Sequence, residues 1–215
     1  MVIETTGALI QGMWGSGKQD FGVLHVLTER RELSLRPEMI TVSHRGVVLC
    51  GGRSADAETL QKAEASKVRG LIVGSLDPDL VGLVRGLSYP VIVTEGFGDA
   101  PMAAPIFTLL QTNAGRETAV DAMPADRWEG RRPEIVIPLP ATSQSPPSPA
   151  EGEPLGPNKR VRVLRAPYAG VTGVVQAVLE ERAILANGLR AQAARVELEE
   201  IGPIVAPVAN LEIIE

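Results

Sequence analysis

Aromatic residues, cysteine, histidine and lysine are all scarce in this chain of 215 residues. Aromatic side chains make up 3%, there is one cysteine, there are two histidines, and only four of the 21 basic residues are lysine. One cysteine excludes an internal disulfide and a cysteine-cluster metal site. The shortage of rings leaves few surfaces on which bases or sugars could stack.

Long apolar runs are missing as well. No stretch approaches the roughly 20 apolar residues that a membrane-spanning helix needs, and the first dozen residues carry Glu4 without the basic segment of a signal peptide. The formal net charge of −5 disfavours a protein that coats nucleic acid or an anionic membrane with its whole surface. Because a lone cysteine is typical of a reducing interior, we expect a cytoplasmic protein without membrane association.

Enough apolar residues remain for a real core. Hydrophobic residues make up 44% of the chain and charged residues 22%, which is typical of a globular protein. Seven of the 17 prolines fall within Pro138–Pro157, a composition that favours an extended spacer. We therefore predict an N-terminal domain at 1–137, a Pro-rich linker at 138–157 and a small module at 158–215. A long surface loop within one domain is the alternative.

The N-terminal domain is predicted to begin with strands and to continue as α/β. Within residues 1–53, strands are expected at Ala8–Ile10, Gly22–Leu27 and Ile40–Cys50, before the glycines at 51 and 52. After these glycines the spacing of apolar residues becomes that of helices, and short buried strands alternate with them. Helices are expected over Asp56–Lys67, after the Asp77-Pro78 cap and over Pro101–Leu110, with strands at Gly70–Val73, Tyr89–Val93 and Ile135–Ile137. This alternation predicts a small, mostly parallel α/β layer, so that the fold class is mixed, α+β.

The C-terminal module has the pattern of a small antiparallel barrel. Short strands are predicted at Lys159–Arg165, Gly173–Val178, Ala193–Leu198 and Asn210–Ile214, and Asn187-Gly188 is typical of a hairpin turn. The run from Arg160 to Gly173, with its loop at Ala166–Gly170, resembles the KOW motif of ribosomal L24-type and NusG-type proteins, as does the ending at Val208–Glu212. The resemblance implies an SH3-like barrel that binds RNA or serves as a protein-docking module.

The N-terminal domain resembles an uncharacterised bacterial family. The resemblance lies in the start Val2–Gly12, in Thr94–Gly98 followed by Met102-Ala103, and in Arg132–Ile135. Members of that family carry a further β-rich segment before this point, so the chain is expected to correspond to the C-terminal part of a longer bacterial protein. No activity comes with this resemblance.

Two glycine-rich segments are candidate phosphate or ligand sites. Gly12–Lys18 has the spacing of a phosphate-binding loop, but Gln19 follows where Ser or Thr should hold Mg²⁺, and the next residues are strand-like; we predict a turn between strands. Thr94–Gly98 follows a buried strand and precedes a helix, where open α/β sheets place ligands. Thr94, Glu95, Gly96 and Gly98 are therefore weak candidate ligand-binding residues; a glycine-rich turn in which Glu95 is solvated or caps the helix is favoured. Swivelling phosphohistidine carriers have a comparable arrangement, but they need a histidine that this segment lacks.

The only concentrated positive patch opens the C-terminal module. Lys159, Arg160, Arg162 and Arg165, with Tyr168 and Gly170 in the following loop, are the candidate partner-binding residues. Arg160 and Arg162 share one face of their strand, with Val161 and Val163 on the other. Seven basic residues balance seven acidic ones across 158–215, and Tyr168 is the only ring in the patch. A protein partner is favoured over RNA on these grounds. Self-association into a homo-oligomer is a further possibility that the sequence leaves open.

No residue pattern predicts catalysis. His25 and His44 have no third ligand at metal spacing, and no serine lies in a nucleophile elbow, so we expect no catalytic residue, no metal site and no cofactor. The sequence favours a non-enzymatic binding or adaptor protein. The alternative is a small-ligand- or anion-binding protein, or an enzyme, that uses Thr94–Gly98.

Overall fold

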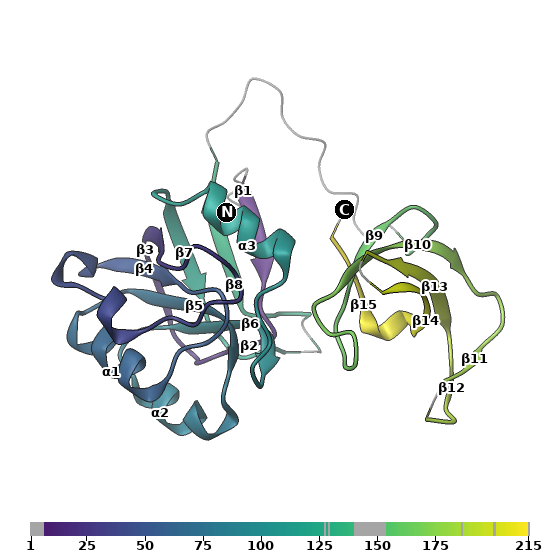
Figure 1. Ribbon diagram of the computed structural model, residues 1–215, viewed down its shortest axis with the longest axis horizontal. Helices are drawn as coiled ribbons and strands as arrows, with labels where there is room; N and C mark the ends of the chain where they lie inside the picture. Colours follow the sequence, from purple (N-terminus) through teal and green to yellow (C-terminus); the bar gives the residue numbers. More distant parts are fainter. Residues whose placement is uncertain are drawn as a thin grey trace. The chain divides into compact units, whose positions relative to one another are not determined.

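A computed structural model describes residues 7–126, 128, 130–139, 154–185, 187–199 and 201–214 (Figure 1). The chain divides into two compact units, unit 1 at Met1–Pro146 and unit 2 at Pro147–Glu215. Most of the predicted Pro-rich linker, from 140 to 153, lies outside the described residues.

Unit 1 is built on one mixed sheet of eight strands in the order β1-β8-β7-β3-β4-β5-β6-β2. The central strands β3 to β6 run parallel to one another, and the other neighbours pair antiparallel. The strands are β1 (Gly7–Gln11), β2 (Trp14–Gly15), β3 (Gln19–Val26), β4 (Val47–Cys50), β5 (Gly70–Leu76), β6 (Val91–Phe97), β7 (Glu117–Asp121) and β8 (Glu134–Pro138).

The two ends of this sheet meet. Strands β1 and β2 lie at opposite ends of the strand order, although only two residues separate them in sequence. Gln11 pairs with Glu134 of β8, whereas the backbone N–H of Met13 already donates to the Val93 carbonyl of β6 at 2.9 Å. One continuous segment, β1 to β2, thus bonds to the strands at both ends of the order, β8 and β6.

Helices cover the sheet on two sides (Figure 1). Helices α1 (Ala57–Ala65) and α2 (Val81–Gly86) pack Leu60 and Val84 into the same core as Val73, and α3 (Ala104–Thr112) packs Phe107 into the core that contains Ile72. Neighbouring residues of β5 thus point into different cores, as the period of a strand requires. The remaining helical elements of unit 1 are the short 3₁₀ helices η1 (Pro37–Met39), η2 (Val42–His44) and η3 (Pro78–Leu80).

Several predicted elements of unit 1 are confirmed. Asp56 caps α1 by accepting from the Thr59 N–H at 2.8 Å, and Asp77 accepts from the Asp79 N–H at 3.0 Å at the start of η3. The buried strand predicted at Gly70–Val73 is the first half of β5. Local capping chemistry was therefore a sound guide to where helices begin.

Other predictions about unit 1 are wrong. Ile40–Cys50 is not one strand, because η2 occupies Val42–His44 and only Val47–Cys50 enters the sheet. The sheet is mixed rather than mostly parallel. The other strands expected within residues 1–53 are present and belong to the same sheet as the α/β strands. Thr94–Gly98 is not a loop, since β6 runs on to Phe97.

Unit 2 is an antiparallel sheet of five strands in the order β14-β13-β10-β9-β15. The 3₁₀ helix η4 (Val208–Asn210) joins the last two strands, and a separate two-stranded hairpin turns at Asn187-Gly188 as predicted. Apolar residues of one sheet face form its core, with Val161, Val163 and Val196 among them. The strands are β9 (Arg160–Val163), β10 (Thr172–Val178), β11 (Ala183–Ile184), β12 (Arg190–Ala191), β13 (Ala193–Leu198), β14 (Gly202–Pro207) and β15 (Leu211–Ile213).

Candidate functional site

The arginines of β9 are tied into ion pairs on the polar face of unit 2. Arg162 is only 3% exposed, and its Nη2 lies 2.6 Å from Oε2 of Glu212 in β15. Arg160 Nη2 lies 2.6 Å from Oε1 of Glu199, whose other carboxylate oxygen accepts from the Thr172 hydroxyl. The Arg160 hydrogen bond and that of Thr172 lower the pKa of Glu199 below its usual range, so this carboxylate is ionised at neutral pH. Arg162 and Glu212 lie directly opposite each other on the neighbouring strands β9 and β15, so that their charges neutralise one another.

The positive patch predicted from the sequence is therefore smaller than expected. The strand faces are as predicted, because Val161 and Val163 enter the core, but Arg162 is buried rather than offered to a partner. Arg165 is exposed and has no ion-pair partner among the residues that the structure describes. The ring of Tyr168 packs against the core of unit 2, which reduces its free surface for stacking.

A shallow hollow of about 400 Å³ lies beside these residues. Lys159, Arg160 and Val174 line it together with Pro157 and Asn158. The loop that carries Tyr168 and Gly170 returns the chain to β10, with the Gly170 N–H donating to the Val163 carbonyl at 2.8 Å. Gly170 has a φ of +83°, a conformation that favours glycine. Lys159 and Arg160 are thus the two members of the predicted patch that share a concave surface.

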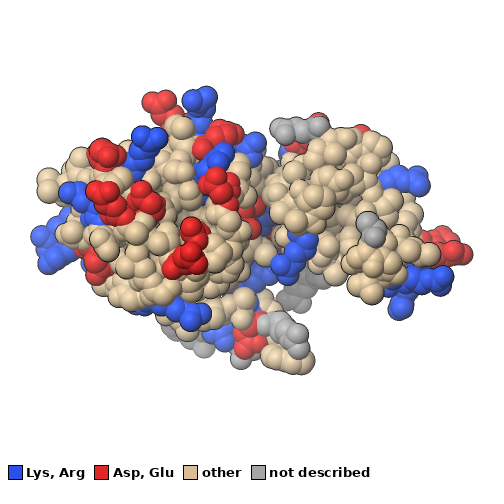
Figure 2. Space-filling view, turned by 60° about the horizontal axis from the view of Figure 1, so that its bottom comes forward, with Lys and Arg blue, Asp and Glu red and all other residues tan. Residues whose placement is uncertain are grey.

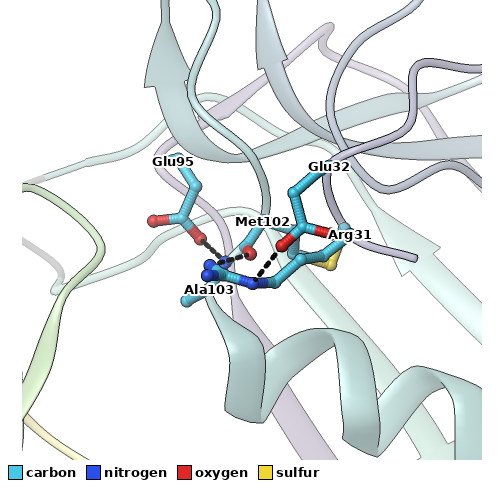
Figure 3. Close-up of polar contacts among 5 residues, drawn as sticks. All are labelled: Arg31, Glu32, Glu95, Met102 and Ala103. Atoms are coloured by element: carbon cyan, nitrogen blue, oxygen red, sulfur yellow. Dashed lines mark hydrogen bonds and ion pairs between the residues drawn. The ribbon is translucent and has the colours of Figure 1, made fainter. Parts of the chain in front are cut away.

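Several residues of the segment Thr94–Gly98 make contacts that stabilise the fold. Thr94 is fully buried in β6. The carboxylate of Glu95 accepts from the Ala103 N–H at 2.9 Å and so lies at the first turn of α3 (Figure 3). The place where an anion would meet this helix therefore holds a carboxylate of the chain itself, as the capping interpretation expects. Arg31 also contacts the start of this helix, because its Nη1 donates to the Met102 carbonyl at 3.3 Å (Figure 3).

A second hollow, of about 380 Å³, opens where the parallel strands β4, β5 and β6 end. Of the predicted ligand residues only Gly98 lines it; Thr94, Glu95 and Gly96 do not. Asp99, which follows, pairs with Arg53 at 2.8 Å. We call this hollow the carboxyl-edge pocket, and its lining residues are Ser34, Leu35, Arg36, Ser54, Ala55, Asp56, Asp77, Leu80, Gly98 and Asp99.

Sequence reasoning missed most of the carboxyl-edge pocket. Asp77 was assigned to helix capping and Asp56 to the start of its helix; both also line the pocket. A usable signal was present: each residue lies between a predicted strand and the body of the helix that follows it, and the carboxyl ends of parallel strands meet at one edge of a sheet. Arg36 carried no such signal, because it lies in the long crossover between β3 and β4.

The other sequence candidates have structural roles. Gly12–Lys18 joins β1 to β3 by way of β2 and no helix follows it, which confirms the predicted turn; Lys18 Nζ donates to the Arg85 carbonyl at 2.8 Å. Among the described residues no group of three acidic, histidine or cysteine side chains could hold a metal ion. Cys50 is buried in β4, and burial raises the pKa of its thiol to about 12. The thiol is thus not a candidate nucleophile.

His25 and His44 form an edge-to-face pair with ring centroids 5.7 Å apart. Nδ1 of His44 accepts from the Thr41 N–H at 3.0 Å and so completes a capping box around η2. Partial burial, and then the neighbouring charge of His25, lower the pKa of His44 from 6.5. The folded chain therefore takes up a proton at His44 less readily than the unfolded chain does.

We expect the free energy of unfolding to fall as the pH drops below about 6.5, because the unfolded chain then protonates His44 while the folded chain resists it. The stabilisation is fully present above that pH. His44→Gln should remove this part of the pH dependence while keeping a side-chain acceptor at a position where capping boxes often use Gln. Urea unfolding between about pH 5 and 8 measures it; an equal drop in His44→Gln contradicts the assignment.

Comparisons of the chain with protein-family models, with curated proteins and with solved structures found no match.

Proposed function

We propose that this chain is a non-enzymatic binding or adaptor protein of the bacterial cytoplasm in which unit 2 docks a protein partner. The observation that carries the proposal is the pairing of Arg160 with Glu199 and of Arg162 with Glu212. A surface that follows a phosphate backbone needs cations free to replace counterions, and these two arginines already have carboxylate partners. A protein partner needs no such excess of positive charge.

We further propose that unit 2 is an SH3-like barrel of the KOW type. Support comes from its strand order, in which the last strand, β15, pairs with the first, β9. The 3₁₀ helix η4 before β15 and the loop at Ala166–Gly170 between β9 and β10 agree with the resemblance noted in the sequence. Barrels of this kind offer loops and shallow hollows to partners, and the hollow beside Lys159 is one such place.

Surface charge elsewhere supports a protein partner over a nucleic acid. On the face drawn in Figure 2, acidic and basic side chains are interspersed over unit 1 rather than gathered by sign. Among the described residues no helix is long and apolar enough to cross a membrane. A mixed surface gives no long-range attraction to polyanions, whether RNA or an anionic lipid surface.

The test uses the full chain as bait in a bacterial lysate treated with nuclease. We expect a protein to stay bound after the nuclease, and to be lost when Lys159→Glu and Arg165→Glu are introduced together. Arg45→Glu, an exposed arginine of unit 1, is the matched control and should retain the partner. Retention that disappears with nuclease, or that survives the double substitution of Lys159 and Arg165, contradicts the proposal.

A second candidate function is the binding of a small ligand by unit 1. The observation in its favour is the carboxyl-edge pocket, which has a volume in the range of small-molecule sites and lies where open parallel sheets place their ligands. Gly98, at the end of the segment singled out from the sequence, belongs to it. Amide chemical shifts of the labelled chain during titration with a panel of metabolites test this function.

A further inference from the structure

The carboxyl-edge pocket contains opposite charges that are not paired with each other. Arg36 lines it, as do Asp56 and Asp77, and none of the three has an ion-pair partner among the residues that the structure describes. The third carboxylate, Asp99, is already neutralised by Arg53. A purely anionic ligand would face Asp56 and Asp77, and a purely cationic one would face Arg36. The charges therefore suit a ligand that carries both signs.

Both carboxylates are held in place by the helices that they cap. Oδ1 of Asp56 accepts from the Thr59 N–H and Oδ1 of Asp77 from the Asp79 N–H. The Thr59 hydroxyl and then its backbone N–H lower the pKa of Asp56, so this group stays ionised at neutral pH. An ammonium group entering the pocket would meet carboxylates whose positions are fixed before it binds, which lowers the entropy cost of binding.

The remaining lining residues are apolar or carry hydroxyl groups, and hydrogen bonds join the segments to which they belong. Leu35 and Ala55 form a parallel bridge, with the Leu35 N–H donating to the Ser54 carbonyl at 2.8 Å. The hydroxyl oxygens of Ser34 and Ser54 lie 3.0 Å apart. Leu80, from η3, is half-buried and adds a further aliphatic side chain. Leu35 and Ala55 are only 1% and 3% exposed, so Leu80 is the aliphatic side chain of the lining that a ligand can reach.

We propose that the carboxyl-edge pocket binds a small aliphatic α-amino acid as its zwitterion. Arg36 holds the carboxylate of the ligand, Asp56 and Asp77 hold its ammonium group, and Leu80 contacts its side chain. The inference rests on the second candidate function, ligand binding by unit 1, and is independent of partner docking by unit 2. Because the pocket is open and its charged groups are exposed, the affinity is expected to be modest.

The test is a titration of the isotope-labelled full chain with L-leucine, followed by amide chemical shifts. We expect saturating shifts confined to residues 34–36, 54–56, 77–80 and 98–99. Isopentylamine, which lacks the carboxylate, and isocaproate, which lacks the amine, should each bind about tenfold more weakly or worse. Asp56→Asn, which keeps a good helix cap, and Arg36→Gln should each weaken L-leucine by about tenfold. Arg45→Gln, outside the pocket, should leave it unchanged.

Each contrary outcome has a distinct meaning. If isocaproate or isopentylamine binds as well as L-leucine, the pocket is a simple anion or cation site and the zwitterion proposal is overturned. If L-leucine gives no saturating response but another compound of the metabolite panel shifts the same amides, the proposal fails and ligand binding by unit 1 stands. If no compound shifts these amides, both fail.

Discussion

Glu212→Gln is expected to destabilise unit 2 by about 3 kcal/mol, because it removes the negative charge that pairs with the buried guanidinium of Arg162. Arg162 is 3% exposed and Glu212 is 18% exposed, so water cannot replace the lost partner. Glutamine keeps the shape of the side chain and an oxygen acceptor, which confines the change to the charge. Both tryptophans belong to unit 1, so the effect is best followed by amide hydrogen exchange in β9, β10 and β15.

The neighbouring pair supplies the control for this experiment. Arg160 and Glu199 are 39% and 50% exposed, and pairs of that kind contribute less than about 1 kcal/mol. Arg160→Gln should therefore leave exchange in the same strands nearly unchanged. If Arg160→Gln and Glu212→Gln have equal effects, burial of the Arg162 pair is not what stabilises the polar face of unit 2.

Gly74→Ala is expected to destabilise unit 1 by about 3 kcal/mol, the upper range for overpacking. A Cβ on Gly74 would stand 2.5 Å from the backbone nitrogen of Met102 and 2.8 Å from the carbonyl oxygen of Gly52. Both atoms belong to backbone that is hydrogen-bonded together, since the Met102 N–H donates to the Gly52 carbonyl. The methyl group can be admitted only if the loops after β4 and β6 separate. Urea unfolding followed by tryptophan fluorescence measures the loss.

Gly82→Ala is the matched substitution for Gly74→Ala. Gly82 lies on the exposed side of α2, and a Cβ there would meet nothing within 4 Å. Replacing glycine by alanine inside a helix should stabilise unit 1 by roughly 0.5–1 kcal/mol. The two substitutions are thus expected to change the free energy of unfolding in opposite directions. Destabilisation of similar size by both would contradict the role given to the close packing around Gly74.

Local features of unit 1 could be predicted because short-range chemistry decides them. The caps at Asp56 and Asp77 and the buried strand at Gly70–Val73 follow from neighbouring residues alone. The pairing of one short segment with both ends of the sheet could not be predicted, because it depends on Met13 bonding to Val93, a residue 80 positions away. Ile40–Cys50 failed as a strand since the Thr41–His44 capping box favours a helical turn, and a histidine is not the usual partner in such a box.

In unit 2, too, the sequence did not predict an edge strand or the ion pairs of the polar face. β14 was missed because Pro203 and Pro207 interrupt its pattern, although prolines are compatible with an edge strand, which β14 is. The alternation of Arg160, Val161, Arg162 and Val163 predicted the strand and its faces. It could not reveal that Glu199 and Glu212, distant in sequence, would neutralise the two arginines. The sequence showed which basic residues make up the patch, whereas the fold decides which of their charges are neutralised.

Binding of the full chain to labelled RNA, single-stranded and duplex, tests the docking role of unit 2 most directly. Fluorescence anisotropy would be recorded at low salt and at about 0.15 M salt, where exposed charges more than about 8 Å apart are screened. The account predicts weak binding at low salt that is lost at 0.15 M, because the arginines of β9 are held by Glu199 and Glu212. Sub-micromolar binding that persists at about 0.15 M salt, and that Arg160→Glu abolishes, would contradict it.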